Sequence, residues 1–159
     1  IEESFPGTKS EGKVNRIALR DILNKEPEKF RDLEKIVHPA TRRYQIVYIE
    51  KLINEGNPGC ILDIPLLFET GGEKYIDVSV VVTASEDKQK ERVVSERKVP
   101  LEIFNSIKNQ QMPDREKLKK ADYIISTDQT LDETKLEVKD VVSKIKLINP
   151  QAWKAFYKK

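Results

Sequence analysis

The chain has 159 residues, of which 35% are charged and 38% apolar, and its formal net charge is only +2. So small a net charge does not indicate that the chain as a whole binds nucleic acid. No apolar run approaches the ~18 residues of a membrane-spanning helix. The single cysteine, Cys60, excludes an internal disulfide and has no metal-ligating neighbours. We expect a cytoplasmic globular protein with no metal site, no nucleic-acid or membrane partner, and a buried Cys60.

The first third of the chain is predicted to be helical after an opening, residues 1–14, that is either a loop or a short helix followed by a turn. Asn15 has the side chain of a helix N-cap, so a first helix is expected from there to Leu23. A second helix is predicted from apolar residues at steps of three and four between Phe30 and Leu52. Pro39 predicts a bend in it.

Three short apolar runs are predicted to be strands, at residues 60–64, 76–83 and 121–126. Their near-continuous apolarity indicates burial on both faces. Ser85 is the expected N-cap of a helix that reaches Arg97. A last helix is expected to bury Val138, Val141, Val142 and Ile145. Strands that alternate with helices predict an α/β protein whose parallel sheet carries helices on both faces.

Charge is unevenly distributed along the chain. Residues 88–120 hold 10 basic and 5 acidic residues, a net charge of +5, which leaves −3 for the rest. This segment is either a solvated helical surface or an element that closes over a polyanion such as a phosphate chain.

Seven motifs follow one another along the chain: Asn15-Arg16-Ile17-Ala18-Leu19, His38-Pro39, Asp63-Ile64-Pro65-Leu66-Leu67-Phe68-Glu69, Gln89-x-x-Arg92, Ser95-Glu96-Arg97, Gln111-Met112-Pro113 and Lys120-Ala121-Asp122-Tyr123-Ile124-Ile125. In this order and rough spacing they resemble the dephospho-coenzyme A kinases, from about residue 5 to about residue 145. The run from Asp63 to Glu69 is the most specific of them.

The resemblance implies a P-loop kinase-like fold. It assigns residues 1–56 to a helical substrate domain that binds coenzyme A, residues 57–87 and 121–159 to a nucleotide-kinase core, and residues 88–120 to a helical lid. It also implies a reaction, the transfer of the γ-phosphoryl group of ATP to the 3′-hydroxyl of the dephospho-coenzyme A ribose. The expected ligands are ATP, Mg²⁺ and dephospho-coenzyme A.

Two arginines are the candidates for the chemistry. Arg97 is expected at the end of the first lid helix, where a guanidinium can clamp phosphate oxygens through two hydrogen bonds, and Arg92 precedes it by five residues. Gln111 and Thr127 match family positions near the adenine. A plain surface role is the alternative for all four.

Five further residues are expected to bind the substrate. By resemblance, Arg16 holds the diphosphate, His38 contacts the ligand, and Leu66 and Glu69 lie beside the substrate. Asp63 stands at the end of a predicted strand, where α/β proteins place ligands. Simple packing is the alternative for Leu66, and a surface or structural role is the alternative for the others.

One part of the family pattern is missing from these residues. P-loop kinases hold phosphates with G-x-x-x-x-G-K-[ST] between a strand and a helix, and the chain contains no such motif. Gly7-Thr8-Lys9-Ser10 lacks the first glycine and follows no predicted strand. The family's catalytic base also has no match. Because the chain opens with Ile1, we expect these parts to precede it in the intact protein, ATP and Mg²⁺ to need them, and the 159 residues alone to be inactive.

The missing part also bears on the sheet, because the P-loop strand of the family lies between the strands matching residues 60–64 and 76–83. We expect those two strands to have unpaired edges and the chain to be unstable alone. Two other functions stay open, a non-catalytic module that binds coenzyme A and a P-loop kinase for another small molecule. The sequence does not indicate an oligomeric state.

Overall fold

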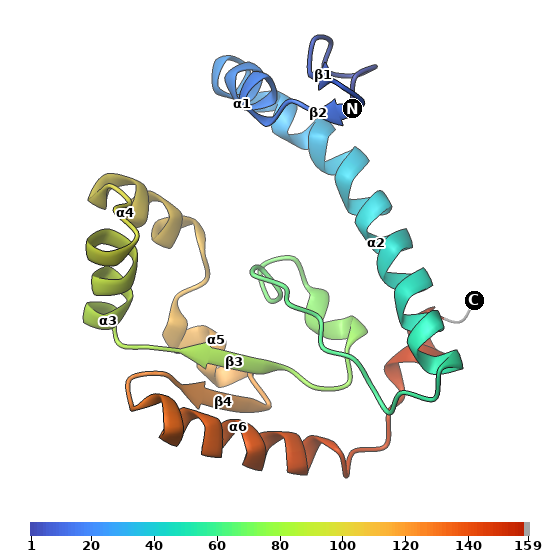
Figure 1. Ribbon diagram of the computed structural model, residues 1–159, viewed down its shortest axis with the longest axis vertical. Helices are drawn as coiled ribbons and strands as arrows, with labels where there is room; N and C mark the ends of the chain where they lie inside the picture. Colours follow the sequence, from blue (N-terminus) through green and yellow to red (C-terminus); the bar gives the residue numbers. More distant parts are fainter. Residues whose placement is uncertain (158–159) are drawn as a thin grey trace. The chain divides into compact units, whose positions relative to one another are not determined.

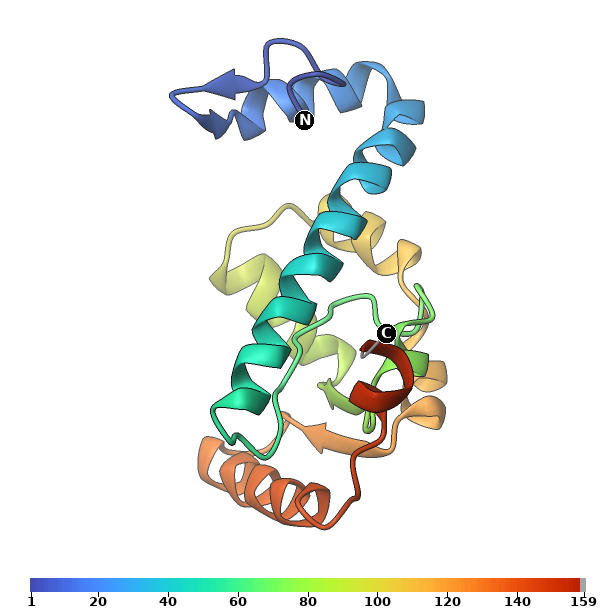
Figure 2. The same cartoon turned by 90° about the vertical axis from the view of Figure 1, so that its right-hand side faces the viewer.

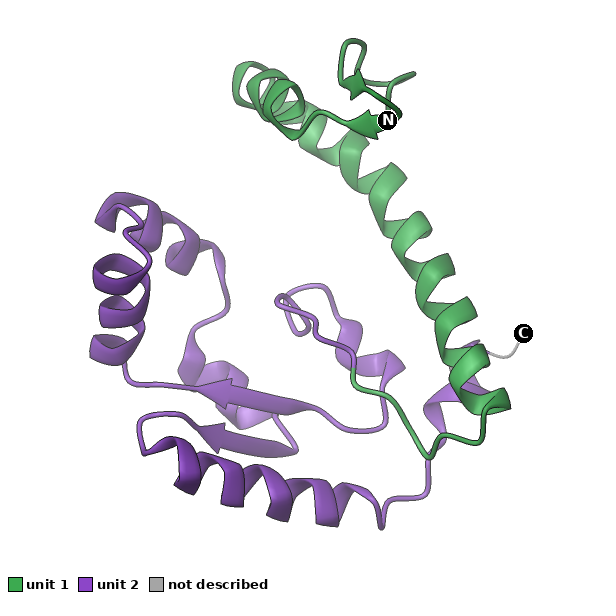
Figure 3. Ribbon diagram, viewed as in Figure 1, with its two compact units in different colours: residues 1–61 green, residues 62–159 purple. Residues whose placement is uncertain are grey.

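A computed structural model describes residues 1–157 and divides the chain into two compact units, Ile1–Ile61 and Leu62–Lys159 (Figure 3). The first unit opens with a hairpin at residues 9–14, where the sequence predicts a loop or a short helix and a turn but no strands. Strands β1 (Lys9–Ser10) and β2 (Lys13–Val14) pair antiparallel. Glu11 and Gly12 between them have φ angles of 51° and 79°, and positive φ at both central residues is typical of a tight hairpin turn.

Two helices make up the rest of the first unit. The N-cap prediction for Asn15 is confirmed, because its Oδ1 accepts the backbone N–H groups of Ile17 and Ala18 at 3.1 Å each. Helix α1 (Arg16–Lys25) follows. After the 3-10 turn η1 (Pro27–Lys29), helix α2 (Phe30–Asn54) continues through Pro39 without interruption.

The second unit is built on a two-stranded parallel sheet of β3 (Val80–Thr83) and β4 (Tyr123–Ser126). Val80 lies opposite Tyr123 and Thr83 opposite Ser126. Helix α5 (Asp114–Lys120) lies along β3, and α6 (Leu131–Ile145) lies along β4 (Figures 1 and 2). Ile125 of β4 and Val141 of α6 are buried. The prediction of an α/β protein with a parallel sheet is confirmed.

The predicted strand at residues 60–64 is wrong. No strand forms there; Cys60 is exposed and Ile61 is 92% exposed. The strand predicted at residues 76–83 is also shorter, since β3 begins only at Val80. Strands form where a neighbouring backbone accepts and donates hydrogen bonds, and among residues 1–157 β3 pairs with β4 alone, over the length of β4. The predicted burial of Cys60 fails for the same reason, because no neighbouring strand covers that run.

Between β3 and β4 the chain makes a helical excursion, in which Figure 1 shows α3 and α4 beyond one end of the sheet. The helix predicted to end at Arg97 is helix α3 (Glu86–Lys90) continued by the π-helical stretch η3 (Glu91–Glu96). Helix α4 (Leu101–Gln110) follows and buries Phe104. Ser85 precedes α3 but does not cap it, because its hydroxyl donates instead to Asp128 Oδ1 at 2.8 Å.

Side-chain hydrogen bonds cap two helical segments in the last part of the described chain. Thr130 and Glu133 form a reciprocal capping box at the start of α6. Asp77 Oδ1 accepts the backbone N–H groups of Gln151 and Ala152, at 2.5 and 2.8 Å, ahead of the π-helical stretch η4 (Trp153–Tyr157). Of the four residues expected to be buried on α6, Val141 is buried, whereas Val138 and Val142 are 39% and 38% exposed. The buried face is therefore narrower than predicted, since one short strand cannot cover a wide apolar stripe.

Candidate active site

The carboxyl ends of β3 and β4 are joined by Thr127, the residue after β4. Its backbone N–H and its hydroxyl both donate to the carbonyl oxygen of Thr83, at 2.9 and 3.0 Å. In open α/β sheets this end of the strands is where ligands bind. Thr127 therefore extends the ladder by one residue and gives this edge a fixed geometry.

Arg92 lies directly on Thr127. One terminal nitrogen of its guanidinium donates to Thr127 Oγ1 at 2.8 Å and the other to the Thr127 carbonyl oxygen at 2.6 Å. The structure thus brings together two residues that the sequence assigned to different tasks, catalysis and adenine binding. With both terminal nitrogens engaged, Arg92 anchors the helical excursion to the sheet.

Gln89, one turn before Arg92, makes a second anchor. Its amide nitrogen donates to the carbonyl oxygen of Ala84 at 2.8 Å and to Asp114 Oδ2 at 2.6 Å. Ala84 begins the excursion after β3, and Asp114 is the first residue of α5. One side chain therefore ties the two ends of the segment 85–113 to each other.

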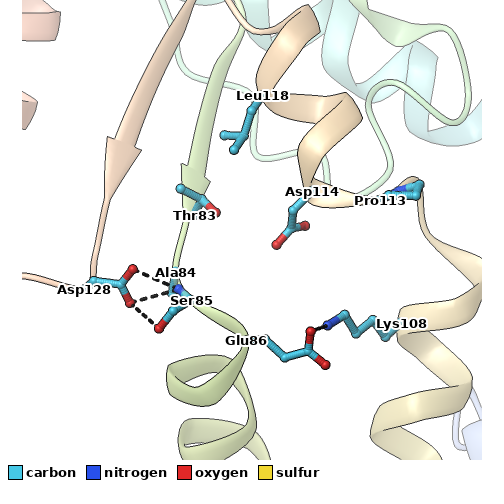
Figure 4. Close-up of a pocket in the computed structure, with 9 residues that line it drawn as sticks. All are labelled: Thr83, Ala84, Ser85, Glu86, Lys108, Pro113, Asp114, Leu118 and Asp128. Atoms are coloured by element: carbon cyan, nitrogen blue, oxygen red, sulfur yellow. Dashed lines mark hydrogen bonds and ion pairs between the residues drawn. The ribbon is translucent and has the colours of Figure 1, made fainter.

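A hollow of about 540 Å³ opens beside these anchors (Figure 4). Its lining consists of Thr83, Ala84, Ser85, Glu86, Lys108, Pro113, Asp114, Leu118 and Asp128. On one side Asp128 accepts the backbone N–H of Ser85 at 2.9 Å and its hydroxyl at 2.8 Å. On the other side Lys108 Nζ pairs with Glu86 at 2.8 Å. Gln111, expected near the adenine, is half-buried just before Pro113.

The lining of this hollow is acidic, although the segment 88–120, which supplies part of it, is basic. Glu86, Asp114 and Asp128 line it, against the single ammonium group of Lys108. Hydrogen bonds from the backbone and then the hydroxyl of Ser85 hold the pKa of Asp128 below its ordinary value, and Lys108 lowers the pKa of Glu86. The Glu86 and Asp128 carboxylates are thus ionised near neutral pH. Such a lining suits hydroxyl and amino donors better than phosphate oxygens.

A second cluster surrounds Glu69, in the turn that follows Pro65. Glu69 Oε1 lies 3.0 Å from Lys117 Nζ and accepts the backbone N–H of Met112 at 2.8 Å. Burial raises the pKa of Glu69, but hydrogen bonds from Lys117 and from the backbone N–H groups of Glu69 and Met112 outweigh it and lower the pKa overall. The other oxygen, Oε2, is buried and has no hydrogen-bond partner among residues 1–157.

Three other predicted residues of the second unit point to solvent. Asp63, Leu66 and Arg97 are exposed, and Leu66 is 41% exposed. Arg97 caps the C-terminal end of η3, and its backbone N–H donates to the Arg92 carbonyl oxygen at 3.2 Å. Its guanidinium is therefore available to a ligand, unlike that of Arg92.

Two predicted residues belong to the first unit, and both are exposed there. Arg16 is the first residue of α1, where N–H groups and the positive end of the helix dipole are found. His38 lies on α2 and lines an open hollow of about 570 Å³ together with Arg31, Glu34, Lys35 and Pro39. One arginine and one lysine beside His38, against the single carboxylate of Glu34, give that surface a weakly cationic character.

Sequence reasoning missed Lys117, Asp114 and Asp128. Lys117 was counted only as one charge of the basic segment, and its buried position has no local signature. Among residues 1–157 no three His, Cys, Asp or Glu side chains gather as a metal site requires. Within the same residues no helix is both long and apolar enough to cross a membrane.

Comparisons with known proteins agree on one family. The family model for dephospho-CoA kinase matches residues 1–133. A dephospho-CoA kinase of Rhodopseudomonas palustris is 39% identical over 142 residues, which is 89% of this chain and 71% of the relative. One from Bartonella henselae is 40% identical over 145 residues, 91% of this chain and 74% of the relative.

Two solved structures share the fold of this chain. A crystal structure from Thermus thermophilus has a TM-score of 0.74 at 29% identity and covers 93% of this chain and 75% of that one. The dephospho-CoA kinase from Campylobacter jejuni has a TM-score of 0.62 at 26% identity and covers 91% of this chain and 73% of that one. The chain belongs to the dephospho-CoA kinase family.

Proposed function

We propose that this protein transfers the γ-phosphoryl group of ATP to the 3′-hydroxyl of the dephospho-CoA ribose, the last step of coenzyme A biosynthesis. The family match over residues 1–133 is the observation that carries the proposal. In the reaction the ribose hydroxyl oxygen forms a bond to the γ-phosphorus and its proton is released. The bond from that phosphorus to the β–γ bridging oxygen breaks, and ADP leaves. Such a transfer depends on positioning and on stabilising charge at the transferred group.

Arg97 is the residue we assign to the phosphates. Its guanidinium is exposed at the end of η3, in the most basic segment of the chain. An arginine in this position can clamp two phosphate oxygens at once. Arg92 we assign instead to holding η3 against Thr127, since its two terminal nitrogens are already occupied.

The nucleotide is proposed to lie at the carboxyl ends of β3 and β4. Gln111 and Thr127 lie within two residues of Pro113 and Asp128, which line the hollow there. Its acidic lining suits the hydroxyl and amino groups of a nucleoside. Mg²⁺ would enter with the phosphates, as is usual in kinases. The described residues do not by themselves form a metal site.

The acceptor substrate is proposed to lie against Glu69, with Asp63 and Leu66 beside it. Arg16 and His38 of the first unit are proposed to contact the diphosphate and the rest of the coenzyme. The three-part division into substrate domain (1–56), core (57–87 and 121–159) and lid (88–120) belongs to the same proposal.

The test is an ADP-release assay with ATP and dephospho-CoA on the protein expressed from its gene, with product identified by mass. Formation of coenzyme A with one ADP per turnover is expected. Calorimetric binding of dephospho-CoA without turnover would favour a non-catalytic binding module instead. Faster turnover of a nucleoside or another hydroxyl acceptor in a substrate panel would point to a different kinase.

A further inference from the structure

Two lysines of helix α5 contact two consecutive residues of the turn, Phe68 and Glu69. Lys117 Nζ lies 3.0 Å from Glu69 Oε1, and Lys120 Nζ lies 5.9 Å from the centre of the Phe68 ring. Residues three apart on a helix lie on the same face. One face of α5 therefore carries both lysines against this turn.

The side chains of the Lys117–Glu69 pair are mostly covered by the protein. The side chain of Lys117 is 14% exposed and that of Glu69 is 17% exposed. By contrast, the pair Lys144–Asp140 joins side chains that are 55% and 60% exposed, and pairs of that kind contribute little. Removing one partner of a buried pair leaves an uncompensated charge, so Lys117 constrains the Glu69 carboxylate far more than a surface lysine would.

Both contacts that other residues make with the carboxylate fall on one oxygen. Lys117 and the backbone N–H of Met112 take Oε1, while Oε2 is buried and unpartnered among residues 1–157. A buried acceptor without a donor is costly. Oε2 can therefore accept a hydrogen bond from a donor that residues 1–157 do not supply.

Helix α5 is also held from the other side, independently of Glu69. Asp114 at its start accepts from Gln89 at 2.6 Å. Asp122, just after its end, accepts the backbone N–H and the hydroxyl of Ser79 at 2.8 and 2.7 Å. The position of Lys117 is thus set by α3 and by the start of β3, not by the turn that it contacts.

We propose that Lys117 is a positioning residue for the acceptor substrate: it holds Glu69 through Oε1 so that Oε2 accepts the ribose hydroxyl of dephospho-CoA. The inference rests on the proposed function, in which Glu69 lies in the substrate site. Lys117 itself does not touch the substrate in this assignment and acts only through Glu69.

The experiment compares Lys117→Met, Lys117→Arg, Glu69→Gln and the double variant Lys117→Met/Glu69→Gln in the protein expressed from its gene. Lys119→Met, at an exposed position of the same helix, is the matched control. The KM for dephospho-CoA, the KM for ATP and kcat are measured for each. Lys117→Met is expected to raise the KM for dephospho-CoA by roughly tenfold or more, with the KM for ATP changed by less than about twofold. Lys117→Arg should recover most of the loss, because it keeps the charge.

The double variant decides how Lys117 acts. If Lys117 works through Glu69, the double variant equals Glu69→Gln alone, since additivity fails for residues that act as a unit. Losses that multiply, an unchanged KM in Lys117→Met, or no effect of Glu69→Gln would each overturn the inference. Should Lys117→Met fail to fold, the double variant, which has no uncompensated charge, still gives the comparison with Glu69→Gln. A wild-type protein that does not phosphorylate dephospho-CoA defeats the proposed function instead.

Discussion

The guanidinium of Arg92 donates to both the hydroxyl and the carbonyl oxygen of Thr127, at 2.8 and 2.6 Å. Thr127 in turn donates twice to Thr83. The end of the sheet and the first helix of the excursion are therefore one hydrogen-bonded unit.

Arg92→Lys should destabilise the protein, because a lysine has one terminal nitrogen and cannot replace the two that donate to the hydroxyl and the carbonyl oxygen of Thr127. We expect the free energy of unfolding to fall by about 1–2 kcal/mol, measured by urea denaturation. The exposed Arg115→Lys is the control and should change it by less than about 0.5 kcal/mol. Equal stability of Arg92→Lys and wild type would show that the two hydrogen bonds do not hold η3.

Arg97→Ala tests the phosphate clamp. Because the side chain is exposed, the melting temperature should stay unchanged, while kcat falls by as much as ~10³-fold, the range for one arginine in phosphoryl transfer. The KM for dephospho-CoA should change much less. A loss of kcat below roughly fivefold, about 1 kcal/mol, would mean a surface role.

His38→Ala tests the substrate role of α2. The side chain is exposed, so we expect folding to be retained, the KM for dephospho-CoA to rise and the KM for ATP to hold. Glu50→Ala, also exposed on α2, is the control. Equal increases in both KM values would indicate damage to the fold rather than a lost contact.

Stability in acid should depend on Glu69. Its folded-state pKa lies below the ordinary value of 4.5, so its contribution is present above that value and is lost as the pH falls through the lowered pKa. Glu69→Gln should therefore show a shallower fall in unfolding free energy between about pH 6 and about pH 3. Urea titrations across this range measure it, with exposed Glu102→Gln for comparison. Parallel curves for wild type and Glu69→Gln would contradict the role of the buried pair.

The capping box of α6 gives a prediction about stability alone. Thr130→Ala removes the hydroxyl that accepts the Glu133 N–H and should cost about 1 kcal/mol. Thr130→Ser keeps that oxygen and should lose little. Thermal melts of the two variants compare them, and a loss of the same size in both would assign the effect to the lost methyl group.

Short-range physics explains which elements were predicted well. The Asn15 cap, the 3.6-residue spacing of α2 and the apolar runs of β3 and β4 each rest on neighbours a few residues away. The run at residues 60–64 has the same composition as a strand, yet it forms none. Composition favours a strand, but only a partner at hydrogen-bonding distance makes one.

The sequence by itself determined the family, the helices α1 and α2, the approximate places of β3 and β4, and the residues worth testing, because motifs and caps are local patterns. Only the tertiary structure decided what those residues contact. Arg92 meets Thr127 across 35 positions, and Glu69 meets Met112 across 43. Such pairs depend on how a parallel crossover returns the chain to the sheet. No spacing rule indicates which lysine of a basic segment will be buried against a carboxylate, since burial follows from packing rather than from sequence neighbours.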